Sequence, residues 1–160
     1  GSDHAAPNFH WDILVRCGDP AIAAVGATFN PLTSKDGWFG MPDNCAFDSL
    51  GRLWIATDGN APGTTGRADG IWAMETKGAA RATSKLFYRV PVGAEMCGPA
   101  FTPDLETFFV AVQHPGEGDE KALSTFEKPT TRWPAAANSS APPRPSVVAI
   151  TRKGGGKIAV

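Results

Sequence analysis

The 160-residue chain lacks strong net charge, and none of its uninterrupted apolar runs is long. The formal net charge is −1, which gives no overall basic field to attract nucleic acid. Gly and Pro interrupt the apolar runs, which fall well short of the roughly 20 residues that a membrane-spanning helix needs. No signal peptide is visible either. We therefore expect neither nucleic acid nor a membrane as a partner.

Cysteine and histidine are also scarce. The three cysteines, Cys17, Cys45 and Cys97, are an odd number at wide spacing, and no Cys-x-x-Cys pair occurs. This pattern indicates neither a disulfide framework nor a structural zinc site.

Glycine and proline are abundant by contrast. The 18 Gly and 14 Pro residues together make up a fifth of the chain, whereas hydrophobic residues make up 42%. Such a composition is typical of short strands joined by turns, and the apolar content argues against a disordered chain. The length corresponds to one domain. Residues 1–8 are expected to be a tag remnant and a disordered lead-in to a domain over 9–160.

An internal repeat organises the middle of the sequence. "DNCAFDSLGRLWIATD" (43–58) aligns with "EMCGPAFTPDLETFFVAVQ" (95–113), which gives an offset of 54 positions between Phe47 and Phe101. "GIWAMETKG" (70–78) aligns with "SVVAITRKG" (146–154) at an offset of 76 positions. The difference between the offsets is explained by a Pro-rich insertion at 114–145, which is expected to be a long surface excursion.

Each repeat can be divided into four short strands. The predicted strands are 42–48, 52–57, 70–75 and 84–90 in the first repeat, and 97–102, 107–113, 146–152 and 156–160 in the second. Four strands recurring every 40–55 residues or so are typical of β-propeller blades, although a two-sheet β-sandwich remains an alternative.

The predicted fold is therefore all-β and β-propeller-like. It comprises about two four-stranded antiparallel blades of a larger propeller, at about 41–92 and 93–160, and a strand at 9–19 would belong to a preceding blade. Two blades cannot close a ring, which needs roughly four to eight. We expect the open blade edges to be covered by self-association or by further chain.

Two carboxylates occupy equivalent places at the start of a blade. Asp43 and Glu95 both lie where a loop enters the first strand, the strand that lines the central channel of a propeller. Two carboxylates directed at one axis would repel unless a cation lay between them, and a hard metal ion with oxygen ligands would meet this need. The amide oxygen of Asn44 is a further candidate ligand. Alternatively, Asp43 caps a turn and Glu95 is a solvated charge.

Other reactive side chains give weaker indications. Cys97 could act as a nucleophile with His114 as its base, but Cys45 occupies the equivalent place in the other repeat, which favours a packing role for both cysteines. "TDGNAPGTTGRADG" (57–70) fits neither a P-loop nor an EF-hand and is expected to be a hairpin loop. Asp58, Asp69 and Arg67 from this loop, together with His114, are candidate ligand-binding residues.

Several longer strings resemble a known family. "WDILVRCGDP" (11–20), "MPDNCAFDSLGRLWIATDG" (41–59), "GAEMCGPAFTPDLETFFVAVQHPGE" (93–117) and "VVAITRKGGGKI" (147–158) resemble the carboxy-terminal part of the PhoX-type alkaline phosphatases. The resemblance runs from about Phe9 to Val160. The third string is the most specific, and the second alone would be weak because many propellers carry something similar.

The resemblance implies a six-bladed propeller that is exported through the twin-arginine route to the periplasm or beyond the cell. It also implies hydrolysis of phosphate monoesters at a cluster of calcium and iron ions in the central channel. Asp43 of the "PDN" motif resembles a channel-facing metal ligand of this family, and Glu95 of "GAEMCGP" is a second candidate.

The chain differs from members of this family in its length. Members of the family are several times longer, so most metal ligands and the phosphate-binding arginine are missing here. We therefore expect a fragment with little or no phosphatase activity and with no metal necessarily bound. A non-catalytic propeller module that binds a ligand or partner, and a calcium-dependent lactonase-like hydrolase, are the alternative functions.

Overall fold

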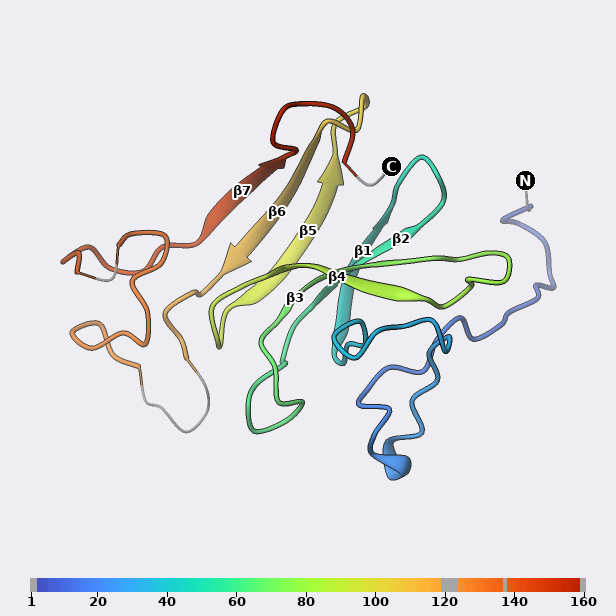
Figure 1. Ribbon diagram of the computed structural model, residues 1–160, viewed down its shortest axis with the longest axis horizontal. Coiled ribbons are helices and arrows are strands. Elements are labelled where there is room, and N and C mark those ends of the chain that lie inside the picture. The colour runs from blue at the N-terminus through green and yellow to red at the C-terminus, as the bar shows by residue number, and fades with distance from the viewer. Residues whose placement is uncertain (1–2, 119–123, 137, 159–160) are drawn as a thin grey trace.

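The computed structural model describes residues 3–118, 124–136 and 138–158. Its strands form two antiparallel sheets (Figure 1). The first sheet has the order β1-β2-β3-β4, with β1 at Pro42–Phe47, β2 at Leu53–Thr57, β3 at Gly70–Met74 and β4 at Ser84–Arg89. The second has the order β5-β6-β7, with β5 at Glu95–Phe101, β6 at Thr107–Gln113 and β7 at Ser146–Thr151.

Each sheet is a meander in which consecutive strands pair, as in a propeller blade. The only helical element among the described residues is one 3-10 turn, η1, at Ala23–Val25. The prediction of an all-β, propeller-like fold is confirmed. No described helix has the length and apolar character required to traverse a bilayer.

The register of the two sheets reproduces the sequence repeat. Cys45 in β1 lies opposite Ile55, and Cys97 in β5 lies opposite Ala111. Each first strand also carries an irregularity in register, between Pro42 and Cys45 in β1 and between Cys97 and Ala100 in β5. Such bulges redirect side chains locally, so side-chain direction at these strand starts does not follow simple alternation.

Two of the predicted strands are wrong in the residues that the structure describes. Within the predicted closing strand, 156–160, no strand forms at Gly156–Ile158, and the last two residues lie outside the described part. Three consecutive glycines, Gly154 to Gly156, have φ between 82° and 90°, which is incompatible with an extended strand. They turn the chain back, so that the Ile158 N–H donates to the Leu105 carbonyl at 2.9 Å.

The predicted strand at 9–19 is absent as well. Only one isolated bridge forms there, between Arg16 and Thr28. Leu14 and Val15 instead pack against a face of the first sheet. This segment therefore covers the sheet and does not extend it as an edge strand.

The main core lies between the two sheets. In β6, the buried residues alternate with more exposed ones, which directs Phe108, Val110 and Val112 toward the first sheet. Trp54 lies at the centre of this core, and its ring centroid is 4.8 Å from that of Phe108. Trp133 from the Pro-rich insertion also packs against this core, so the insertion is anchored at one point.

The outer faces of the two sheets differ. Segment 14–39 (blue in Figure 1) covers the outer face of the first sheet. Phe39 of this segment packs there against Trp72 and Met74. On the second sheet, Phe109 and Val147 retain 36% and 71% exposure. The first sheet is therefore covered on both faces, and the second mainly on one.

Candidate metal centre

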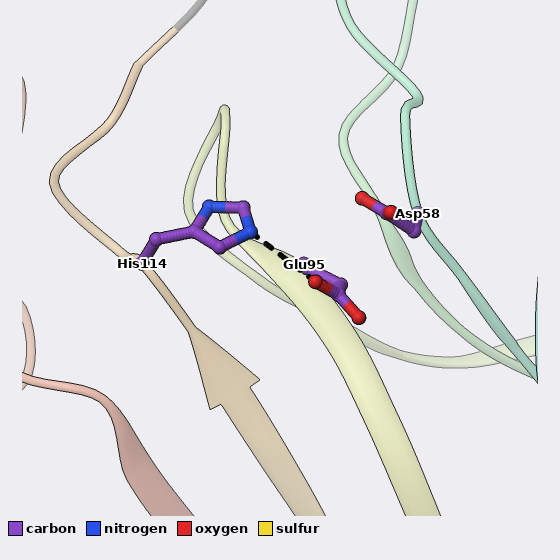
Figure 2. Close-up of side chains that lie close together, drawn as sticks. All are labelled: Asp58, Glu95 and His114. Carbon is purple, nitrogen blue, oxygen red and sulfur yellow. Dashed lines mark hydrogen bonds and ion pairs between the residues drawn. The ribbon is translucent and has the colours of Figure 1, made fainter.

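Three potential ligands meet where strands of both sheets begin or end. Glu95 is the first residue of β5, and it pairs in register with Gln113, the last residue of β6. His114 follows Gln113 directly, which brings its ring to the Glu95 side chain. Asp58 follows the end of β2 in the first sheet. Figure 2 shows Glu95 between His114 and Asp58.

The distances within this cluster are suitable for a shared cation. Asp58, Glu95 and His114 each place one potential ligand atom within 4.8 Å of the others. The His114 Nε2 atom lies 3.2 Å from Glu95 Oε2. The side chain of Glu95 is only 15% exposed, compared with 40% for His114. Two carboxylates and one imidazole are a chemically suitable donor set for a transition metal.

Neighbouring groups orient two of these three side chains. His114 Nδ1 lies 3.0 Å from the Gly93 carbonyl oxygen and 2.7 Å from Glu117 Oε2. The Gln113 side-chain amide donates to Glu95 Oε1 at 2.8 Å. A carboxylate or carbonyl on the far nitrogen of an imidazole is the usual support of a metal-ligating histidine. The arrangement leaves Nε2 facing Glu95.

The electrostatics of the cluster favour positive charge. Burial lowers the pKa of His114, but its hydrogen bond to Glu95 and the negative charges of Glu117 and Glu95 outweigh burial and raise the pKa above its usual value. The carboxylates therefore stabilise the protonated form of the ring when no cation is bound.

Cys97 lies in the same negative field. Burial raises the pKa of its thiol, and the charges of Glu95, Asp43 and Asp58 raise it further, despite a hydrogen bond from the Gln113 amide at 3.2 Å that acts in the opposite direction. A thiol with a raised pKa is poorly nucleophilic at neutral pH, which argues against a nucleophilic role for Cys97. The packing role predicted for both cysteines is wrong for Cys45, whose side chain is exposed on β1.

One residue of the cluster and one residue near it have unusual backbone angles. His114 has φ of 32° and Met41 has φ of 51°, in a region that residues other than glycine seldom adopt. The Met41 carbonyl accepts a hydrogen bond from the Asp58 N–H at 3.1 Å, which ties β1 to the loop that carries Asp58. Backbone strain of this kind recurs at functional sites.

The remaining predicted site residues lie outside the three-residue cluster. Asp43 is exposed on β1, although its charge reaches Cys97. The Asn44 side-chain oxygen accepts a hydrogen bond from the Gly98 N–H at 3.2 Å and thereby links β1 to β5. Arg67 is separate from the cluster, and its guanidinium lies 3.5 Å above the ring of Trp38.

The loop at 57–70 contains two aspartates with different environments. Asp69 is buried and accepts hydrogen bonds from the Thr57 hydroxyl at 2.6 Å and from the Asn60 side-chain amide at 2.7 Å. Asp58 is exposed and reaches Glu95 and His114. Asp69 therefore fixes the loop, and Asp58 is the candidate ligand.

Sequence reasoning did not identify Gln113 and Glu117 as part of the site. Both belong to the string "VQHPGE" (112–117), in which only His114 was a candidate site residue. The local signal was a histidine at a strand end with a carboxylate three residues later. Its importance depends on the β5–β6 register, which the sequence alone did not establish.

The chain is similar to known proteins in both sequence and structure. The family model described as alkaline phosphatase PhoX matches residues 1–116. The chain belongs to the PhoX alkaline phosphatase family. This membership confirms the resemblance that the sequence motifs indicated.

A solved member of the PhoX family has the same arrangement of strands. "Pseudomonas fluorescens PhoX in complex with vanadate, a transition state analogue" is 32% identical to this chain and superimposes with a TM-score of 0.67. The match covers 91% of this chain and 23% of the Pseudomonas chain, so the protein spans about a quarter of the length of that relative. No curated protein matches the chain.

Proposed function

We propose that this chain contributes part of the active site of a metal-dependent hydrolase that cleaves phosphate monoesters. The observation that carries the proposal is the convergence of Asp58, Glu95 and His114, from two blades, in a chain of the PhoX family. The related Pseudomonas PhoX binds vanadate, described as a transition state analogue, which supports chemistry at a phosphoryl group.

The ligands divide by chemical type. The His114 imidazole with the Glu95 and Asp58 carboxylates suits a transition metal such as iron. The ligand atoms of Asp43 and Asn44 would be a carboxylate oxygen and an amide oxygen, which suit calcium at a neighbouring position. Bound metal ions would neutralise the phosphate and lower the pKa of a water molecule that attacks it.

Residues around the ligands hold them in place for this role. Glu117 and the Gly93 carbonyl hold the His114 ring through Nδ1, which leaves Nε2 directed at Glu95. Gln113 donates a hydrogen bond to one carboxylate oxygen of Glu95. The other oxygen faces His114 Nε2, so a cation could contact both of these atoms. These contacts favour a site that is formed before metal binds.

Metal binding by the purified chain is the direct test. After treatment with a chelator and its removal, Fe²⁺ and Ca²⁺ are titrated separately by calorimetry. We expect Glu95→Gln to weaken binding of at least one of them by about 10-fold or more, since it replaces a ligating carboxylate. Glu106→Gln, at an exposed glutamate in the β5–β6 hairpin, is the matched control. Equal affinities for the two variants, or no binding of either metal, would contradict the proposal.

Activity is a separate question, because the chain covers only 23% of the Pseudomonas PhoX. We expect hydrolysis of nitrophenyl phosphate near the background rate, since two or three carboxylates cannot hold a multinuclear metal cluster. Clear metal-dependent turnover that Glu95→Gln abolishes would show that these residues suffice.

Two further proposals concern the context of the chain, the first supported by family membership and the second by exposed apolar side chains. The parent protein is secreted, to the periplasm or outside the cell, by the twin-arginine route. The uncovered face of the second sheet, around Phe109 and Val147, associates with another copy of the chain when no further blade covers it.

A further inference from the structure

A cleft lies beside the first sheet, and none of the three clustered ligands lines it. Its volume is about 780 Å³, and its walls come from the segment at 19–38 and from the turn Thr65–Arg67. A smaller cleft of about 440 Å³ shares Asp19, Thr65 and Gly66 with it and extends to Met41. The two clefts thus adjoin, and each has the size of sites that bind small organic molecules.

One wall of the larger cleft carries a guanidinium without a carboxylate partner. Among the described residues, no acidic side chain lies within ion-pairing distance of Arg67. Its Nη1 donates to the Trp38 carbonyl at 2.7 Å, and the guanidinium lies 3.5 Å above the Trp38 ring, which is itself buried. These contacts fix the guanidinium plane but do not neutralise its charge.

Burial and a neighbouring cation also disfavour the charged form of the Arg67 guanidinium. Burial lowers the pKa of Arg67, and repulsion from Arg89 lowers it further, against the attraction of Asp36 and Asp19. An oxyanion bound at the guanidinium would relieve both effects.

The turn that carries Arg67 is rigidly held. The Thr65 hydroxyl donates to the Asn60 side-chain oxygen at 2.7 Å. The Asn60 amide nitrogen in turn donates to the buried Asp69 carboxylate at 2.7 Å and to the Gly40 carbonyl at 3.0 Å. A ligand would therefore meet a preformed wall, which lowers the entropic cost of binding.

Two further charged side chains line the cleft. Lys35 is exposed and adds a second cation. Asp19 is acidic, and its Oδ1 accepts a hydrogen bond from the Ala21 N–H at 2.8 Å. The lining therefore carries two cations and one carboxylate. Arg89 and Asp36, which act on Arg67 from outside the lining, have opposite charges, so the net charge still favours an anion.

We propose that this cleft binds a small organic oxyanion, a phosphorylated or carboxylated molecule, whose anionic group contacts Arg67 and Lys35. A guanidinium fork recognises phosphate and carboxylate equally well in geometric terms, so the shared chemistry is the oxyanion. The proposal does not depend on the metal centre.

Calorimetric titration with three probes tests the proposal. Adenosine 5′-monophosphate, citrate and uncharged adenosine are titrated into the full chain after metal has been removed with a chelator and the chelator has been dialysed away, so that bound metal cannot capture the phosphate. We expect at least one of the two anions to bind, more tightly than adenosine and less tightly at high salt. Binding of the monophosphate alone identifies a phosphate site, citrate alone a carboxylate site, and both a general oxyanion site. If neither anion binds, or adenosine binds as tightly as both, the proposal is wrong.

Variants assign the binding to this cleft. Arg67→Gln should weaken anion binding about 10-fold, since a charged hydrogen bond is lost. Lys35→Gln should weaken it less, and Asp19→Asn should tighten it because a repelling carboxylate is removed. Lys85→Gln, at an exposed lysine on β4, is the matched control.

Two checks keep these results interpretable. If Arg67→Gln fails to fold, because its contacts to Trp38 are lost, the opposite shifts of Lys35→Gln and Asp19→Asn decide the question. Glu95→Gln should leave anion binding by the metal-free protein unchanged, so failure of the metal-site proposal and failure of this one are distinguishable. Unchanged affinity in Lys35→Gln and Asp19→Asn would place any bound anion elsewhere and overturn the proposal.

Discussion

The two sheets come from one sequence repeat, yet they differ in how they are stabilised. The first sheet is covered by the second on one face and by residues 14–39 on the other. The second sheet has a core face and a face on which Val147 is 71% exposed. Substitutions at equivalent strand positions should therefore change the free energy of unfolding by different amounts. Paired substitutions, one in each sheet, measure this difference.

The largest expected effect is at Trp54, which is 1% exposed between the sheets. Trp54→Ala should lower the free energy of unfolding by about 4 kcal/mol, through lost burial and the cavity that remains. Its comparison is Phe109→Ala on the uncovered face, where the loss should be about 1 kcal/mol or less in protein dilute enough to be monomeric. Urea denaturation followed by far-UV circular dichroism measures both. Similar losses for the two variants would mean that the outer face of the second sheet is covered in solution.

The hairpins of the two sheets give the second prediction. Asp48, before the β1–β2 turn, is buried and accepts hydrogen bonds from Arg52 Nε at 2.7 Å and from Trp54 Nε1 at 3.0 Å. Asp48→Ala should cost about 3 kcal/mol, because the buried Trp54 N–H loses its acceptor. Asp104, which holds the β5–β6 turn, is exposed, and Asp104→Ala should shift the urea midpoint much less.

Acid should weaken the contribution of Asp48 to stability. Burial acts to raise the pKa of Asp48, but the hydrogen bonds from Trp54 and Arg52 and the Arg52 charge outweigh it and hold the pKa below its usual value. The stability from Asp48 is therefore present above the unfolded-state pKa, about 3.9, and is lost as the pH falls through the folded-state pKa. Asp48→Asn should flatten this acid limb of a stability-against-pH curve. An unchanged limb would assign it to other carboxylates.

Local patterns predicted most strands well. The seven observed strands agree with the predicted ones to within one or two residues at each end. Apolar runs such as Leu53–Thr57 and the Gly-rich turns between them carry this information locally. The strand predicted at 9–19, and the described part, 156–158, of the strand predicted at 156–160, do not form because tertiary packing and a run of left-handed glycines determine those segments.

The candidate site was less accessible to sequence reasoning. Glu95, His114 and Asp58 were each singled out, but their mutual proximity depends on the β5–β6 register and on how two sheets pack. Asp43 was assigned with Glu95 by analogy between repeats. The irregularity between Pro42 and Cys45 removes the simple alternation on which such an analogy rests.

The uncovered face of the second sheet gives the third prediction. Val147→Glu places a charge at its most exposed apolar position and should shift the chain toward monomer in analytical ultracentrifugation. Ala79→Glu, which adds the same single negative charge at an exposed residue of the first sheet's β3–β4 connection, should leave the association state unchanged. A monomer at all concentrations before any substitution would mean that this face does not mediate self-association.

The smallest expected effect concerns His114, which joins the end of the second sheet to the metal-binding cluster. Its raised pKa means that the stability it adds is complete below the unfolded-state pKa, about 6.5, and is lost as the pH rises through the folded-state pKa. Because its side chain is 40% exposed, solvent screens the ion pairs with Glu95 and Glu117, and the loss should be small. In metal-free protein, the melting temperature of the unaltered chain should fall relative to that of His114→Gln between pH 6 and pH 8. A difference that stays constant would show that these carboxylates do not hold the imidazolium, whereas saturating Fe²⁺ should reverse the sign, since metal binding requires the neutral ring.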